Sequence, residues 1–130
     1  MKKSFLLIIF SLLIQVSNAI VFTDSNLPIV IITTDKNPST GQPYEIPDDP
    51  KVLATMKIIY RPDGSRNYMT DQNNVAYLNY NGRIGIEKRG SSSQDLAKKP
   101  YGLTTLEADN VTTNSVNILG MPKENDWVLN

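Results

Sequence analysis

The sequence contains no cysteine and no histidine. Without cysteine the chain has neither a disulfide framework nor a thiolate nucleophile. Without histidine it has no imidazole to act as a general base or to bind a metal ion. Together these absences exclude much of the standard chemistry of hydrolases, which relies on a nucleophile activated by an adjacent base.

An excess of charge of one sign is also missing, because 13 basic residues balance 13 acidic ones. Without residues 1–19, which are treated below as an export signal, eleven basic and thirteen acidic residues remain, a net charge of −2. Nucleic acids and anionic membranes bind basic surfaces, so neither is expected as a partner. Residues 20–130 suit one small domain that buries roughly 65% of its unfolded surface.

Residues 1–19 have the three parts of a secretory signal. Lys2 and Lys3 form a basic start, residues 5–14 form an apolar core, and Ser17 and Ala19 suit a cleavage site. The apolar run is short for a bilayer span, and no cysteine is available for a lipoprotein anchor. An uncleaved N-terminal anchor is the alternative, which the small residues of the cleavage site disfavour. We therefore expect a secreted, periplasmic or cell-surface protein without a stable membrane anchor after cleavage.

A β-hairpin is predicted in the second half of the chain. Residues 82–89 alternate Ile84 and Ile86 with polar residues and glycine, as a half-buried strand does. Residues 99–107 read as the strand that returns beside it, so residues 90–98 form the connecting loop. Gly85 lies on the polar face of the first strand, where it allows another backbone or a ligand to approach closely.

Other segments extend the β character. Residues 27–34, LPIVIITT, are apolar on both faces and predict an interior strand or one covered on both sides. Residues 54–61 and 116–119 are further predicted strands, and residues 122–130 begin another apolar segment. We therefore expect a mainly β, antiparallel domain over residues 20–130.

A polar-aromatic stretch at residues 66–81 has neither the helical nor the strand periodicity of apolar residues, and it is predicted to be loop or short helix. It contains Tyr68, Tyr77 and Tyr80, whose simplest role is partial burial with the hydroxyl groups in water. A role in stacking against a carbohydrate or nucleotide requires the tyrosines to converge in space. This stretch supports the alternative function of a secreted binding module for a protein or glycan partner.

The loop sequence RGSSSQDLAKKPYG, residues 89–102, allows two interpretations. Consecutive small residues permit the irregular backbone of an anion-binding nest, and Lys98 or Lys99 could reach a phosphate as a point charge. Arg89 could grip a phosphate with two hydrogen bonds. With one glycine in the loop, neither the Walker pattern nor the glycine-loop pattern of kinases is satisfied. The residues alone favour a solvent-exposed hairpin loop with a basic rim.

Several motifs together resemble the amino-terminal part of the CotH family of secreted or spore-associated proteins. The motifs are NLPIVII, KIIY, YNGRIGIEKRGSSSQ, KKPYG and ILGMPKENDWVL, and they extend from about Asn26 to Leu129. The resemblance implies a divergent protein-kinase-like fold, α+β in the complete family, with ATP-dependent phosphoryl transfer to protein and magnesium. It places the nucleotide phosphates at Arg89, Gly90, Ser91, Ser92 and Ser93, with Lys98 or Lys99 as the phosphate-binding lysine. Lys99 is preferred, because it is closer to the strand that begins at Pro100 and Tyr101.

The resemblance also defines what this sequence does not provide. Family members continue beyond the DWVL motif into a helical region that supplies the catalytic acid and the metal-binding residues, whereas this sequence ends at Asn130. We therefore expect residues 20–130 to be a truncated amino-terminal region with no catalytic residue, no metal site and no cofactor of its own. Its expected partners are a protein substrate or a separate carboxy-terminal lobe. Asp95 places a negative charge beside the proposed phosphate site.

Overall fold

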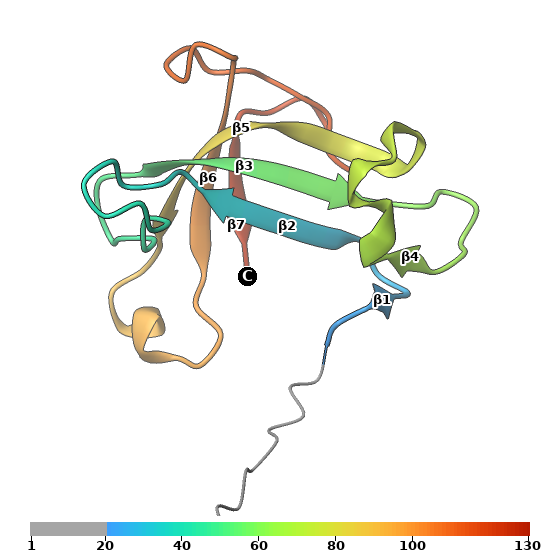
Figure 1. Cartoon of the computed structure of the whole chain (residues 1–130), viewed down its shortest axis with the longest axis horizontal. Helices are drawn as coiled ribbons and strands as arrows, with labels where there is room; N and C mark the ends of the chain where they lie inside the picture. The colour runs from blue at the N-terminus through green and yellow to red at the C-terminus, as the bar shows by residue number, and fades with distance from the viewer. Residues whose placement is uncertain (1–20) are drawn as a thin grey trace, which may run out of the picture.

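The computed structural model describes residues 21–130, so the predicted export signal lies outside the described residues. A five-stranded antiparallel sheet has the order β2-β3-β5-β6-β7 (Figure 1). Its strands are β2 (Ile29–Thr34), β3 (Val52–Ile59), β5 (Leu78–Lys88), β6 (Tyr101–Leu106) and β7 (Asp126–Leu129). The smaller elements are β1 (Asp24–Ser25) paired with β4 (Asn67–Tyr68), and three 3₁₀ helices, η1 (Met69–Asn73), η2 (Val75–Tyr77) and η3 (Ser92–Asp95). The predicted mainly β, antiparallel architecture is confirmed.

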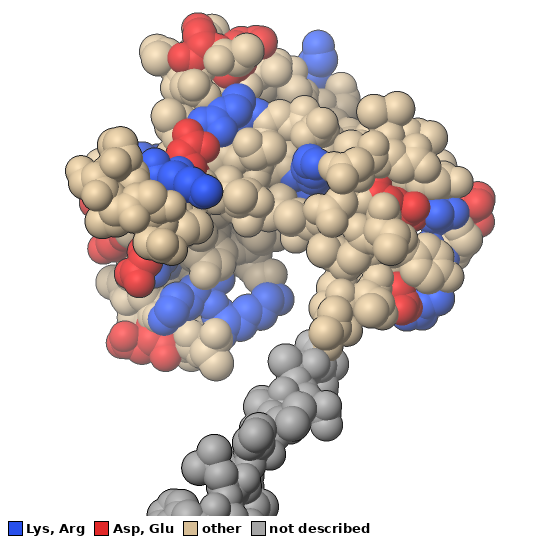
Figure 2. All heavy atoms as spheres, in the orientation of Figure 1, with Lys and Arg blue, Asp and Glu red and all other residues tan. Residues whose placement is uncertain are grey.

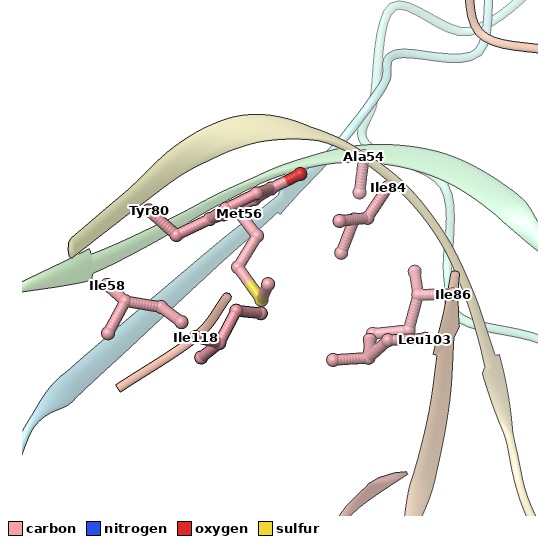
Figure 3. Close-up of a cluster of buried hydrophobic side chains, with 8 residues drawn as sticks. All are labelled: Ala54, Met56, Ile58, Tyr80, Ile84, Ile86, Leu103 and Ile118. Atoms are coloured by element: carbon pink, nitrogen blue, oxygen red, sulfur yellow. The ribbon is translucent and has the colours of Figure 1, made fainter. Parts of the chain in front are cut away.

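One face of this sheet carries the hydrophobic core (Figure 3). Because side chains alternate along a strand, each central strand contributes every second residue to this face. The buried side chains are Ala54, Met56 and Ile58 of β3, Tyr80, Ile84 and Ile86 of β5, Leu103 of β6, and Ile118 of the following segment. Figure 1 shows β6 and β7 running steeply across β2 and β3, so the twisted sheet folds over its own apolar face.

The opposite face of the sheet is polar and is held by charged side chains. Arg83 of β5 donates to both carboxylate oxygens of Asp35, at 2.8 and 2.6 Å, and to the hydroxyl of Thr55 at 3.2 Å. On the same face, Lys57 of β3 donates to Gln72 O at 3.0 Å. Hydrogen bonds from Arg83 lower the pKa of Asp35 below its usual value, so this carboxylate is charged at neutral pH.

The hairpin predicted in the second half is confirmed. β5 and β6 pair antiparallel from Arg83 opposite Leu106 to Lys88 opposite Tyr101. The predicted strand at 54–61 is present as β3, displaced by two residues. Strands β5 and β6 position the loop between them, residues 89–100, which therefore lies at the end of the sheet where β5 stops.

Two strand predictions need correction. Residues 27–34 do not form an interior strand, because β2 has β3 on one side only and is at the edge of the sheet. Residues 116–119 form no strand, since Val116 makes only an isolated bridge to Glu124. The apolar segment that begins at residue 122 instead provides the last strand, β7, whose Trp127 and Leu129 pack against the core.

Candidate functional site

The loop between β5 and β6 is closed by one backbone hydrogen bond, from Arg89 N to Pro100 O at 2.9 Å. Gly90 follows with a φ of 79°, a left-handed conformation that favours glycine. A Cβ atom on Gly90 would lie 2.2 Å from Ser93 Oγ. The close approach of Gly90 and Ser93 therefore depends on the missing side chain at position 90.

Side-chain contacts hold the loop from inside. Gln94 donates from Nε2 to the carbonyl oxygen of Gly90 and to Oδ1 of Asp48, which belongs to the proline-rich connection between β2 and β3. Lys99 donates from Nζ to the carbonyl oxygen of Gln94. Of the two candidate lysines, Lys99 is thus the one that contacts the loop backbone, and this contact uses part of its hydrogen-bonding capacity.

The structure distributes the predicted phosphate-site residues over two neighbouring recesses. Ser93 and Lys98 line the same recess, which has a volume of about 430 Å³, is otherwise bounded by Leu96, Pro100 and Asn130, and has a mainly apolar lining. Arg89 lines a different groove of about 330 Å³, beside β6 and β7. Ser91 and Ser92 are exposed. A single anion in the first recess would therefore contact Ser93 and Lys98, without Arg89.

The groove that contains Arg89 is built around Lys51, a residue that no motif in the sequence marks. Lys51 Nζ lies 2.6 Å from Thr104 Oγ1 and 3.8 Å from the nearest carboxylate oxygen of both Glu87 and Asp126. The Thr104 hydroxyl donates in turn to Asp126 Oδ1 at 2.7 Å. The charge of Lys51 is thus balanced within the groove, which leaves Arg89 as its more available cation.

Two glycines make room for these charged side chains. A Cβ on Gly85 would be 3.4 Å from Lys51 Cβ, and a Cβ on Gly102 would be 3.4 Å from Glu87 Oε1. The expected neighbour of Gly85 is another backbone or a ligand, whereas the structure places the side chain of Lys51 there. No pattern in the sequence signals this contact, because it depends on how β3, β5 and β6 are aligned.

The surroundings of the loop carry both signs of charge. Figure 2 shows basic side chains gathered over the β5–β6 loop, with acidic side chains beside them. Asp95, within η3, is exposed and lies on the same loop as Lys98. Within residues 21–130, no group of three or more aspartate or glutamate residues is placed to hold a metal ion.

The tyrosines of the polar-aromatic stretch converge only in part. Arg61 lies with its guanidinium carbon 3.8 Å from the ring centre of Tyr77 and 5.5 Å from that of Tyr68. Asp71 holds this arginine in place, accepting from Nη2 at 2.7 Å. Tyr80 is separate, because its ring is in the core and its hydroxyl donates to Arg83 O at 3.0 Å. The expected short helical turns are present as η1 and η2, but the prediction is wrong at both ends of the stretch, because residues 67–68 form β4 and residues 78–81 begin β5.

Comparison of this chain with protein-family models, curated proteins and solved structures found no match. The resemblance to the CotH family therefore remains a prediction from the motifs. What the geometry supplies independently is a hairpin loop with Ser93 and Lys98 on one recess. In the part of the chain that the structure describes, no helix is long and apolar enough to cross a membrane.

Proposed function

We propose that the β5–β6 loop binds the phosphate of a nucleotide, and that this secreted β-rich domain corresponds to the nucleotide-binding lobe of a CotH-like protein. The observation that carries the proposal is the shared recess of Ser93 and Lys98. Ser93 and Lys98 are the hydroxyl-bearing and the cationic residue that border this otherwise mainly apolar recess. Such a pair suits an anionic oxygen, because the lysine supplies charge and the serine a directed donor.

The two lysines have different roles in this proposal. Lys98 is exposed and borders the recess, so it supplies the charge that a phosphate meets. Lys99 donates to Gln94 O and thereby keeps the loop in the shape that presents Ser93. Lys99, which the sequence favours as the phosphate-binding lysine, is thus a positioning residue in this proposal.

Magnesium does not fit the residues around this loop. The ion prefers octahedral coordination by oxygen atoms, commonly from one or two carboxylates together with phosphates and water. Asp48 contacts the loop by accepting a hydrogen bond from Gln94. Among the described residues, no three or more acidic side chains are grouped so that they could hold a metal ion. Phosphoryl transfer needs a positioned metal and a group that orients the nucleophile. We therefore propose nucleotide binding without phosphoryl transfer by this chain alone.

Calorimetric titration with ATP in the absence of divalent cations tests the binding proposal. Lys98→Ala should weaken binding about tenfold, as expected for the loss of one charge-assisted contact. Lys123→Ala removes the same charge from an exposed position before β7 and should leave binding unchanged. Binding that survives Lys98→Ala but is lost in Arg89→Ala would place the ligand in the other groove and refute the proposal.

The alternative proposal, a binding module for a protein or glycan, has less support. A sugar would stack on a free face of an exposed aromatic ring. Tyr77 is half-buried and the guanidinium of Arg61 covers one face of its ring, and the same arginine lies near the ring of the exposed Tyr68. A glycan array probed with the wild-type chain and with Tyr77→Ala tests it. Binding to the array that the substitution abolishes would favour this alternative.

A further inference from the structure

One edge of the main sheet offers unpaired backbone groups. β2 pairs with β3 on one side, and among residues 21–130 no backbone hydrogen bond reaches its other side. Asp35 N donates to Leu53 O at 2.9 Å. This hydrogen bond shows which residues of β2 direct their backbone groups toward β3. Because only every second residue of an antiparallel strand bonds to a given neighbour, Ile29, Ile31 and Thr33 bond to β3. Val30 and Ile32 therefore direct their N–H and C=O groups outward.

This edge lacks the features that keep exposed strands from pairing with other chains. Proteins protect such edges with charged side chains, proline, bulges or very short strands. β2 has six residues, IVIITT, with no charge and no proline, and its pairing with β3 runs without a bulge from Ile29 to Thr34. The opposite edge strand, β7, has four residues and carries Asp126. Of the two edges, β2 is the one suited to receive another strand.

We propose that β2 is an association site at which two copies of this chain pair antiparallel about a two-fold axis through Ile31. An axis perpendicular to the sheet keeps the apolar faces of both copies on the same side. Opposed residues must then lie on the same face, so Ile31 faces Ile31 of the second copy and Val30 faces its Ile32. About four backbone hydrogen bonds form between the outward groups of Val30 and Ile32 in the two copies.

The side chains on this edge suit a second copy. Val30, Ile31 and Ile32 are all β-branched, and cross-strand pairs of such residues stabilise a sheet. Neither copy brings a charge, so the symmetric arrangement has no like-charge repulsion between its strands. Val30 is 36% exposed and borders the apolar recess that also contains Met56 and Leu129. Pairing thus extends the core of each copy across the new interface.

Sedimentation velocity over a range of concentrations tests the association. The protein should show a monomer–dimer equilibrium, and Val30→Lys should abolish the dimer. Val111→Lys introduces the same charge outside the sheet, at a residue that is 81% exposed, and should leave the dimer intact. Circular dichroism shows whether each variant is folded. A monomer at every concentration, open-ended aggregation, or equal effects of both substitutions would overturn the proposal.

A cross-linking experiment tests the register and does not depend on the lysine variants. The chain has no cysteine, so a single introduced thiol reports one contact. Across a non-hydrogen-bonded pair the Cα atoms are about 4.5 Å apart, which permits a disulfide, so Ile31→Cys should give a covalent dimer with oxidised glutathione. In Thr33→Cys the two thiol-bearing residues would be about 14 Å apart along the strands, too far to bridge. Equal cross-linking of both variants, or none with Ile31→Cys, would contradict the register.

Discussion

Replacing Gly90 with alanine tests how the loop presents Ser93. Gly90 has a φ of 79°, and a side chain in this left-handed region costs about 1–2 kcal/mol. The new Cβ would also lie 2.2 Å from Ser93 Oγ, so that hydroxyl must rotate away. It then loses its weak contact with Arg89 O, which is 3.4 Å long, and the rotation adds about 0.5–1 kcal/mol. We expect Gly90→Ala to lower the free energy of unfolding by about 2 kcal/mol.

Gly64 provides a matched control, because it has a φ of 80° and a Cβ there would meet no atom within 4 Å. Gly64→Ala should therefore show the backbone cost alone, measured by urea unfolding followed by circular dichroism. The additional cost at Gly90 should disappear when Ser93 is also alanine, in a double-mutant cycle. If the additional cost persists without the Ser93 hydroxyl, or if Gly90→Ala is tolerated without loss, the contact does not define the loop. In ATP titrations, Gly90→Ala and Ser93→Ala should weaken binding to a similar extent.

Three other substitutions, one of them with a control, test the fold. Ile84 is fully buried, and Ile84→Ala should lower the free energy of unfolding by about 2–4 kcal/mol, whereas Val111→Ala, at an exposed position, should change it by less than about 0.5 kcal/mol. The folded-state pKa of Asp35 lies below its ordinary value of 3.8 because Arg83 donates to it, so its stabilisation is present at neutral pH and is lost as the pH falls through the folded pKa. Asp35→Asn should therefore cost about 1 kcal/mol or less at pH 7, since the carboxylate is partly exposed, and should flatten the acid side of a stability profile measured by urea unfolding between pH 5 and 3. Trp127 Nε1 is buried with no acceptor among the described residues, so Trp127→Phe removes no hydrogen bond. It should change the free energy of unfolding, measured by thermal denaturation, by less than about 1 kcal/mol.

The elements that could be predicted from the sequence are those whose signal is local. The alternation of Ile84 and Ile86 with polar residues follows directly from the period of a strand, and both side chains are fully buried in the core. The hairpin could be predicted because two such patterns lie close together along the chain. The segment 116–119 shows the limit of this reasoning, since Ile118 is buried in the core without belonging to any strand.

The position of a strand within the sheet has no comparable local signal. An apolar run of β-branched residues suits an interior strand, but β2 has the same pattern and lies at an edge. The proposed pairing explains why β2 is apolar on both faces, because a second copy would give β2 a second neighbour and make it an interior strand of the dimer. The sequence expectation and the sedimentation experiment therefore address the same property of residues 29–34.

The candidate site could be predicted as a segment of the chain but not as an arrangement of side chains. Arg89, Ser93 and Lys98 lie within ten residues, yet Arg89 borders one groove whereas Ser93 and Lys98 share another recess. Lys51 precedes β3 and reaches the Arg89 groove, and only the register between β3 and β5 places it against Glu87. Proximity in sequence therefore overestimates how many cations one phosphate can contact here. For this reason the separate substitutions Arg89→Ala and Lys98→Ala are more informative than any change that removes both charges together.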